Sequence, residues 1–362
     1  MEVGLYIHIP FCRKRCNYCD FYTFGGAEGV SDDYIKAVKR EIAKHKGLIC
    51  RTVYFGGGTP SLMTANQVKD ILSILNIKEG AEITLEANPD TLTPTKLKEF
   101  RKVGINRLSI GVQTVFDKSL KDLGRIHDSR KAALAFKWAR EAGFENISGD
   151  LMLGLDNYSL EEMNATIDFF KAAGATHVSA YMLKIEEGTP FWYNRPKNMA
   201  DDTHMADFYL AACEKLAKEG YAQYEISNFC KPGYHSRHNT IYWKLEDYLG
   251  IGPSAHSCMG GQRFYYPRDL DLFMEKGETV MDGTADADDY IMLSLRLAQG
   301  LDINYLREHY HLEIDNHIKR KLKIYEKQGF IRVINNCISL TPKGFLVENV
   351  VASDIMSGVN EI

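Results

Sequence analysis

The sequence predicts an α/β fold, in which a partial TIM-like (β/α)6 barrel is followed by a smaller α+β C-terminal domain with a winged-helix-like end. Short apolar runs rich in β-branched residues alternate with amphipathic segments through roughly the first 190 residues. The alternation then stops, and the end of the chain shows helical patterns followed by two short strand patterns. At 362 residues the chain is long enough for a barrel and a second domain.

Six strand candidates occur in order along the barrel part of the chain. They are 4–9 (GLYIHI), 52–55 (TVYF), 82–87 (EITLEA), 107–112 (RLSIGV), 148–153 (SGDLML) and 177–183 (HVSAYML). Helix starts are predicted at Thr64 and Ser159, because each opens an S/T-x-x-E/Q capping box. Helix ends are predicted at Gly143 and Gly174, since glycine adopts the left-handed conformation that terminates a helix. In such a barrel the functional groups lie at the C-terminal ends of the strands.

The rest of the chain has a different pattern. A helix is predicted over about 201–219, and a stretch dense in histidine and aromatic residues covers 221–267. Asn335–Asn336 predicts a hairpin turn between two short strands. We therefore expect three parts, which are a barrel at 1–200, a connecting segment at 201–284 and a C-terminal helical, winged-helix-like domain at 285–362.

Composition excludes several classes of protein. Hydrophobic residues make up 45% and charged residues 25%, the balance of a soluble globular protein. The net charge of −4 gives no indication of nucleic-acid binding, and the basic run at 319–323 is expected to be a solvated helix face. No run of eighteen apolar residues occurs, and the first residues have no signal-peptide pattern. We expect a cytoplasmic chain whose eight cysteines are mostly free thiols.

Three of these cysteines lie close together after the first strand candidate. Cys12, Cys16 and Cys19 have the spacing C-x3-C-x2-C. Thiolates suit iron–sulfur clusters, zinc or copper(I). The alternatives are three unrelated thiols in a loop, or a zinc site with a distant fourth ligand, since structural zinc normally takes four protein ligands. Three thiolates instead bind three irons of a 4Fe–4S cluster and leave the fourth iron open to an external ligand.

The spacing of these cysteines and their place after the first strand resemble the motif of the radical S-adenosylmethionine (SAM) superfamily. The resemblance implies that the amino and carboxylate groups of SAM chelate the open iron. It also implies that electron transfer cleaves SAM to a 5′-deoxyadenosyl radical, while the protein supplies placement and electrostatics.

Glycines and a carboxylate follow the next two strands. The segment YFGGGTPS places Gly57, Gly58 and Thr59 after the second strand, where consecutive glycines let backbone amides approach a carboxylate ligand. Glu86 ends the third strand and can accept a hydrogen bond from the ammonium group of SAM. A plain tight turn is the alternative for the glycines.

Three more polar residues belong to the fourth and fifth strands. Gln113 ends the fourth strand, Arg125 follows it, and Asp150 lies within the fifth strand. Asp150 can bind ribose hydroxyls. The alternative is that Asp150 forms a salt bridge with Arg125 for barrel integrity, because buried charges are usually paired.

Together the motifs resemble the oxygen-independent coproporphyrinogen III dehydrogenase family over nearly the whole chain. The resemblance rests on LYIHIPFCRKRCNYCDF, YFGGGTPS, SIGVQT, DLMLGL and the HemN-type tail from about residue 285. It implies that the cluster and cofactor positions are Tyr6, Cys12, Cys16, Tyr18, Cys19, Gly57, Gly58, Thr59, Glu86, Gln113, Arg125 and Asp150.

The sequence departs from the dehydrogenase in two places. The dehydrogenase has a fourth cysteine two residues after the third, where this chain has Phe21, and a longer segment before its first strand. Both departures resemble the HemW branch of the family, whose members are haem chaperones and which carries an H-N-x-x-Y-W motif. Here that motif is HNTIYW, from His238 to Trp243.

The HNTIYW segment is the candidate haem site. An imidazole can bind haem iron and aromatic rings can line the macrocycle, so His238 is the expected haem ligand. Cys230, His235 and His256 are rival ligands, and zinc binding in this region is a further alternative. A packed, hydrogen-bonded histidine is the structural alternative.

The leading hypothesis is therefore a haem chaperone that binds a 4Fe–4S cluster, SAM and haem. Its expected partners are haem-accepting proteins, namely respiratory cytochromes or storage proteins, with peripheral contact to membrane haemoproteins and homodimer formation left open. The alternatives are a coproporphyrinogen III dehydrogenase and another tetrapyrrole-directed radical enzyme. Whether the chain is an enzyme is left open, although Phe21 argues against the dehydrogenase.

Overall fold

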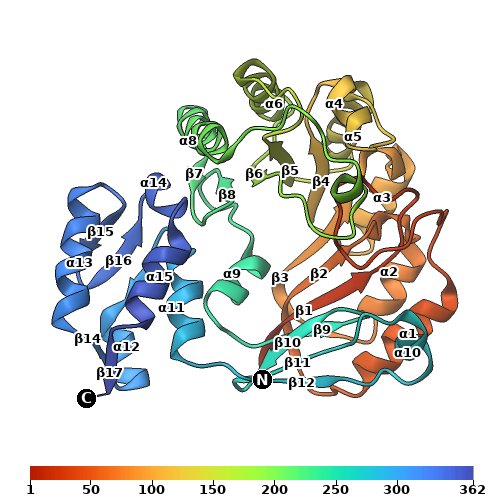
Figure 1. The fold of residues 1–362 in the computed structure, drawn as a ribbon. Helices are drawn as coiled ribbons and strands as arrows, with labels where there is room; N and C mark the ends of the chain where they lie inside the picture. The colour runs from red at the N-terminus through yellow and green to blue at the C-terminus, as the bar shows by residue number, and fades with distance from the viewer. Residues whose placement is uncertain (362) are drawn as a thin grey trace.

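The computed structural model describes residues 1–361, and a sheet of six consecutive parallel strands organises their first half (Figure 1). These strands are β1 (Glu2–Ile9), β2 (Ile49–Gly57), β3 (Asn76–Ala87), β4 (Arg107–Gln113), β5 (Asn146–Leu153) and β6 (His177–Met182). Each strand pairs in parallel with the next one along the chain, as βα units require. All six predicted strands are confirmed, and the structure extends most of them by a few residues.

The helices that connect these strands cover one side of the sheet with their apolar faces inward (Figure 1). They are α1 (Asp32–Ala43), α2 (Ala65–Leu72), α3 (Pro94–Lys102), α4 (Asp117–Asp122), α5 (Ser129–Glu141) and α6 (Leu160–Ala172). Short 3₁₀ turns follow β2 and β3 at η1 (Pro60–Leu62) and η2 (Pro89–Thr91). The apolar side chains of the sheet are buried against these helices. Polar side chains can therefore lie on the other face of the sheet, and the candidate site is found there.

The predicted helix boundaries are confirmed with one difference. Thr64 and Gln67 form a reciprocal capping box, and Gly143 and Gly174 take positive φ angles of 86° and 75° after their helices. Ser159 caps α6 from its side chain, but the Glu162 carboxylate does not return the bond. It accepts hydrogen bonds from the hydroxyls of Thr114 and Ser119 instead, because both are buried and need an acceptor.

The segment 201–284 extends the sheet at both edges. After α7 (Pro190–Tyr193) and α8 (Asp202–Lys218), β8 (Asn228–Cys230) pairs with β6, and β7 (Ala222–Gln223) pairs with β8. At the opposite edge β9 (Tyr248–Ile251) pairs in parallel with β1. The remaining elements continue from β9, and they are β10 (His256–Met259), β11 (Gln262–Tyr265), α10 (Leu270–Glu275) and β12 (Val280–Thr284). The sheet therefore has twelve strands, six more than the sequence predicted.

Six elements of the C-terminal part follow the helix–strand–helix–helix–strand–strand order of a winged helix, with one further short strand inserted between the second and third helices. The elements in that order are α11 (Ala287–Leu295), β13 (Leu301–Asp302), α12 (Ile303–Tyr310), α13 (Asn316–Lys327), β15 (Ile331–Ile334) and β16 (Cys337–Leu340). Asn335 and Asn336 take φ angles of 51° and 61° between β15 and β16, so the predicted hairpin turn is confirmed. The other elements are β14 (Leu312–Ile314), α14 (Pro342–Phe345), α15 (Glu348–Met356) and β17 (Val359–Glu361).

In residues 1–361 no helix has both the length and the apolar character needed to cross a bilayer.

Candidate functional site: a three-cysteine cavity at the strand ends

The three cysteines lie in the loop after β1 and line a single cavity of about 380 Å³. Backbone hydrogen bonds fix this loop, since the Cys12 amide donates to the Phe24 carbonyl at 2.8 Å and the Asn17 amide donates to the Leu123 carbonyl at 2.9 Å. The cavity opens at the C-terminal ends of β2 to β6, where a barrel fold places its functional groups. Its volume falls within the range of small-molecule sites.

The chemistry of the three thiols fits an iron–sulfur cluster. Within residues 1–361 no three His, Cys, Asp or Glu side chains converge as ligands around one metal ion. A 4Fe–4S cluster takes each thiolate on a different iron, and three thiols that line one cavity supply three such ligands, whereas structural zinc normally takes four protein ligands. Burial raises the pKa of Cys12 to about 11 and also raises the pKa of Cys19, so loading of a cluster must release protons from these thiols.

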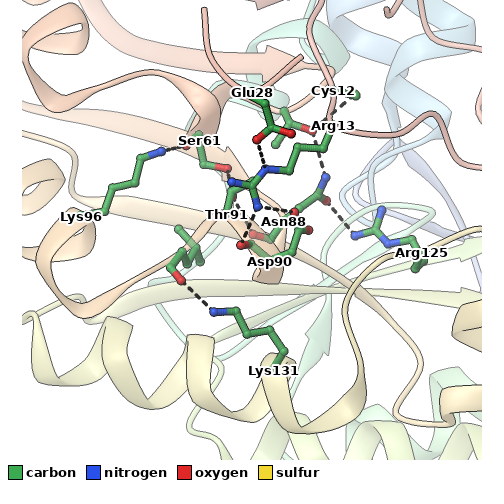
Figure 2. A network of polar contacts seen from close by, with 12 residues as sticks. Cys12, Arg13, Glu28, Ser61, Asn88, Asp90, Thr91, Lys96, Arg125 and Lys131 are labelled. Carbon is green, nitrogen blue, oxygen red and sulfur yellow. Dashed lines mark hydrogen bonds and ion pairs between the residues drawn. The ribbon is translucent and has the colours of Figure 1, made fainter. Parts of the chain in front are cut away.

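A chain of hydrogen bonds joins Cys12 and Cys16 through Asn88, and Figure 2 shows its part from Cys12 to Arg125. The Thr59 hydroxyl donates to the Cys12 sulfur at 3.4 Å, and the Asn88 amide donates to the Thr59 hydroxyl at 2.9 Å. Arg125 then donates to the Asn88 amide oxygen at 2.7 Å and to the Cys16 sulfur at 3.4 Å. These donors stabilise negative charge on the two sulfurs. Asn88 was not predicted, although its place two residues after Glu86 at the end of β3 was a usable signal.

The glycine loop and Glu86 form the next wall of the cavity. The Gly57 amide donates to the Glu86 carboxylate at 3.1 Å, and the Tyr54 hydroxyl donates to its other oxygen at 2.7 Å. A Cβ atom on Gly58 would lie 2.8 Å from the Phe11 carbonyl oxygen and 3.0 Å from the Cys12 sulfur, so a side chain at this position would displace the cysteine loop. Burial raises the pKa of Glu86 to about 7.

Asp150 and Gln113 line the cavity from the neighbouring strands. Asp150 accepts a hydrogen bond from Ser109 at 3.3 Å, and burial raises its pKa to about 6. Arg125 is directed to Asn88, Cys16 and the Gly111 carbonyl, so the alternative of a structural Asp150–Arg125 salt bridge is wrong. The buried Gln113 side-chain oxygen has no hydrogen-bond partner, and its residue has a φ of 71°. An unpaired buried acceptor and a strained backbone on a cavity wall fit a polar ligand in the cavity.

The structure brings most of the expected site residues together. The cavity is lined by Cys12, Cys16, Tyr18, Cys19, Gly57, Gly58, Glu86, Gln113, Arg125 and Asp150. Thr59 acts from behind Cys12, as described above. Tyr6 lies deeper in the barrel, where its hydroxyl contacts the His8 ring at 3.0 Å and its ring stacks on Tyr54.

His238 is in a different place from the other candidates. HNTIYW forms the short helix α9 (Arg237–Trp243), and the His238 side chain is 1% exposed. One ring nitrogen contacts the Thr52 hydroxyl at 2.7 Å, and the other contacts the Tyr242 hydroxyl at 2.6 Å. Gly57 lies at the cavity end of β2, and Thr52 lies about 16 Å before it at the usual rise per residue. Because His238 contacts Thr52, α9 lies toward the N-terminal ends of the strands, away from the cavity.

This arrangement corrects the expectation that the His238 ring is available to haem iron. Both ring nitrogens are engaged and the side chain is buried, so an iron could bind only after the contacts of α9 were broken. The rivals His235 and His256 have exposed side chains, while Cys230 is buried. None of these three residues lines the three-cysteine cavity.

Comparison with known proteins adds independent information on the whole chain. Residues 6–170 match the family "Radical SAM superfamily", and residues 284–347 match the family "HemN C-terminal domain". The protein "Heme chaperone HemW" of Bacillus subtilis is 35% identical, over 95% of this chain and 96% of that protein. "Heme chaperone HemW" of Escherichia coli is 38% identical, over 70% of this chain and 69% of that protein.

Among solved structures, coproporphyrinogen III oxidase (HemN) of Escherichia coli, a radical SAM enzyme, has the same fold. The two structures align with a TM-score of 0.80 over 98% of this chain and 89% of the other, at 22% sequence identity. The predicted α/β radical SAM fold with a C-terminal domain is therefore confirmed.

Proposed function

The chain belongs to the HemW family of the radical SAM superfamily, and we propose that it is a cytoplasmic haem chaperone that binds haem and transfers it to haem-accepting proteins. The observation that carries the proposal is identity of 35% with a haem chaperone along almost the entire length of both chains. The target proteins we propose are respiratory cytochromes or haem-storage proteins.

The residues of the cavity support a cluster and SAM as resident cofactors. Cys12, Cys16 and Cys19 would hold the cluster, while the backbone of Gly57 and the Glu86 carboxylate would hold the amino-acid part of SAM. Asp150 would bind the ribose, since its carboxylate lines the cavity. When bound, the cluster supplies one-electron reduction to this cavity.

The rim of the cavity supports binding of a tetrapyrrole beside the cofactors. Phe21 is 63% exposed at the rim, and Tyr181 and Met182 present further exposed apolar surface there. Lys14 and Lys184 line the same cavity. Lys184 is paired with Glu186 at 2.6 Å, so Lys14 is the cation beside these apolar side chains that can meet a carboxylate of a flat, apolar ring.

Haem titration of the anaerobically reconstituted protein tests the proposal. We expect stoichiometric haem binding, followed by transfer to an apo-cytochrome, and Phe21→Ala should weaken haem binding. The matched control is Tyr193→Ala, because Tyr193 is an exposed aromatic residue that does not line the cavity. A wild-type protein that binds no haem would refute the proposal.

The coproporphyrinogen III dehydrogenase alternative makes a different prediction. It requires anaerobic formation of protoporphyrinogen IX in the presence of SAM and a reductant. Phe21 argues against it, because an aromatic ring offers neither a thiol ligand nor a proton donor at the position where the dehydrogenase has cysteine. Turnover by the wild-type protein would favour this alternative.

A further inference from the structure

The helix α9 is held between the barrel and the C-terminal part of the chain (Figure 1). The Glu82 carboxylate accepts hydrogen bonds from the backbone amides of Arg237 and His238, at 3.2 Å and 3.0 Å. At the other end of the helix, the Arg296 guanidinium lies 4.7 Å from the centre of the Trp243 ring. The HNTIYW helix is therefore held at both ends. This is expected of a helix that connects two parts of the fold rather than of an open ligand site.

His238 contacts a residue that reaches the cofactor cavity. Its ring stacks on the Tyr54 ring with centroids 5.0 Å apart and an interplanar angle of 25°. The Tyr54 hydroxyl donates to the Glu86 carboxylate at 2.7 Å, and the same carboxylate accepts from the Gly57 amide. Three residues thus form a continuous path, in which a buried imidazole orients a phenol and the phenol orients a cavity carboxylate.

The path has little freedom to rearrange. The two ring nitrogens of His238 are bonded to Thr52 and Tyr242, so the imidazole cannot turn without loss of a buried hydrogen bond. Tyr54 is also confined by Tyr6, whose ring stacks on it with centroids 6.0 Å apart, and by Gly56, where an added Cβ atom would lie 2.9 Å from its ring. A change at His238 should therefore displace Tyr54 and alter the hydrogen bond to Glu86.

We propose that His238 is a positioning residue for the SAM site, which holds the Glu86 carboxylate in place through the ring of Tyr54. The inference rests on the cofactor part of the proposed function, since it takes Glu86 as a SAM contact. It assigns the H-N-x-x-Y-W motif of this chain to cofactor placement at the interior of the barrel. It does not require haem to reach His238.

The experiment measures SAM binding and haem binding separately on the reconstituted full chain. His238→Ala should weaken SAM binding about three- to tenfold, the effect of one lost ordering hydrogen bond, and leave haem binding within about twofold. His238→Phe keeps an aromatic face against Tyr54 but has no ligating nitrogen, so it should restore most of the SAM affinity. His204→Ala removes an exposed histidine outside the path and serves as the control.

Two readouts separate positioning from a general loss of stability. Tyr54→Phe keeps the ring and removes the hydroxyl, so it should weaken SAM binding to a degree similar to His238→Ala. The double variant, His238→Ala with Tyr54→Phe, should lose less SAM-binding free energy than the sum of the losses in the two single variants. Loss of the Tyr54 bond should also move the pH midpoint of SAM binding upward in each variant, because that bond stabilises the ionised carboxylate. A lower melting temperature with additive effects and an unmoved midpoint would overturn the inference.

The haem measurement keeps the two proposals apart. If His238→Ala abolishes haem binding while SAM binding is unchanged, His238 is a haem ligand and the inference is wrong. If the wild-type protein binds SAM but no haem, the chaperone proposal fails while the SAM results still decide the role of His238.

Discussion

Asn88 accepts a hydrogen bond from Arg125 at 2.7 Å, and this single contact links the donors of two cysteine sulfurs. On one side Asn88 donates to Thr59, which donates to Cys12, and on the other side Arg125 donates to Cys16. Asn88 and Arg125 line the same cavity as the thiols and donate hydrogen bonds to them or to their partners, so the link can tune a cluster without ligating it. Partners of this kind fix ligand orientation in metal sites.

Asn88→Ala should therefore reduce cluster retention without preventing folding. Removal of the amide leaves Thr59 without a donor and Arg125 without one acceptor, which should speed the loss of iron to a chelator by about tenfold, the lower end of such effects. The measurement is the decay of cluster absorbance under anaerobic conditions. Asn198→Ala is the control, since Asn198 is exposed and its side chain makes no contact with the cavity. Equal decay rates in both variants would contradict the prediction.

Substitution of any one of the three cavity cysteines should abolish cluster assembly. Cys12→Ala, Cys16→Ala and Cys19→Ala each remove one iron ligand, so reconstitution should give little bound iron and sulfide. Cys50→Ala is the matched control, because Cys50 is a buried thiol outside the cavity and should leave cluster content unchanged. Iron and sulfide analysis decides the outcome, and a full cluster in any of the three single variants would rule out that ligand.

Gly58→Ala should disturb the cysteine loop by steric contact alone. The new Cβ atom would meet the Phe11 and Ile9 carbonyls at 2.8 Å and 2.9 Å and the Cys12 sulfur at 3.0 Å. Because two of these atoms are backbone, relief requires movement of the loop, and cluster content should fall. Gly29→Ala is the control, as an added Cβ there meets nothing within 4 Å. Cluster content that is the same in the two variants would show that the loop adjusts freely.

SAM binding should depend on pH through Glu86. The pKa of this carboxyl is about 7 in the free protein because the group is buried, and only its ionised form attracts the SAM ammonium. SAM affinity should therefore fall about tenfold from pH 8 to pH 6, the change in the ionised fraction of such a group. Glu86→Gln should bind SAM more weakly with a flatter profile, and its residual slope reports titration of the ligand itself. Identical slopes in the two proteins would exclude Glu86 as the cause.

The stability of the protein without cofactors should show the opposite dependence on pH. Burial raises the pKa of Glu86 from 4.5 to about 7 and of Asp150 from 3.8 to about 6, so the folded state retains protons that the unfolded state releases. This contribution to stability is complete below the unfolded pKa values and is lost as the pH rises through 6 to 7.

Glu86→Gln and Asp150→Asn should therefore stabilise the cofactor-free protein at pH 8, each by about 1–3 kcal/mol, with little effect at pH 5. Denaturant unfolding at the two pH values provides the measurement. Glu187→Gln is the control, because Glu187 is exposed, and it should change the free energy of unfolding little at either pH value. No gain at pH 8 would mean that the two carboxylates are well accommodated in their ionised forms.

Local patterns predicted the elements of the fold that depend on neighbouring residues. The six strands, the capping box at Thr64 and the turn at Asn335–Asn336 all follow from short-range rules, and each is confirmed. Glu162 shows where those rules stop. Its carboxylate has the correct spacing for a capping box, but it accepts hydrogen bonds from two buried hydroxyls instead, one in the loop after β4 and one in α4.

The candidate site was predictable where the motif residues lie at strand ends. The barrel geometry brings the cysteine loop, Gly57, Glu86 and Asp150 to one cavity, as expected. His238 was expected to be a haem ligand, but its ring is buried with both nitrogens engaged, and nothing in HNTIYW shows what the helix packs against. The roles of Asn88 and of the strands β9 to β12 were missed for the same reason, since they depend on pairings between remote parts of the chain.

The pairing of β9 with β1 has a consequence for how the protein is made. β1 is synthesised before β9, and its outer edge must wait for residues 248–251 to leave the ribosome before it gains this partner. During that interval the nascent chain exposes an apolar strand edge, the kind of surface that chaperones bind and that promotes aggregation. A chain released after residue 200 would keep that edge exposed, along with the edge of β6 that β8 covers. The nascent chain is thus most prone to aggregation before the segment 201–284 has been synthesised.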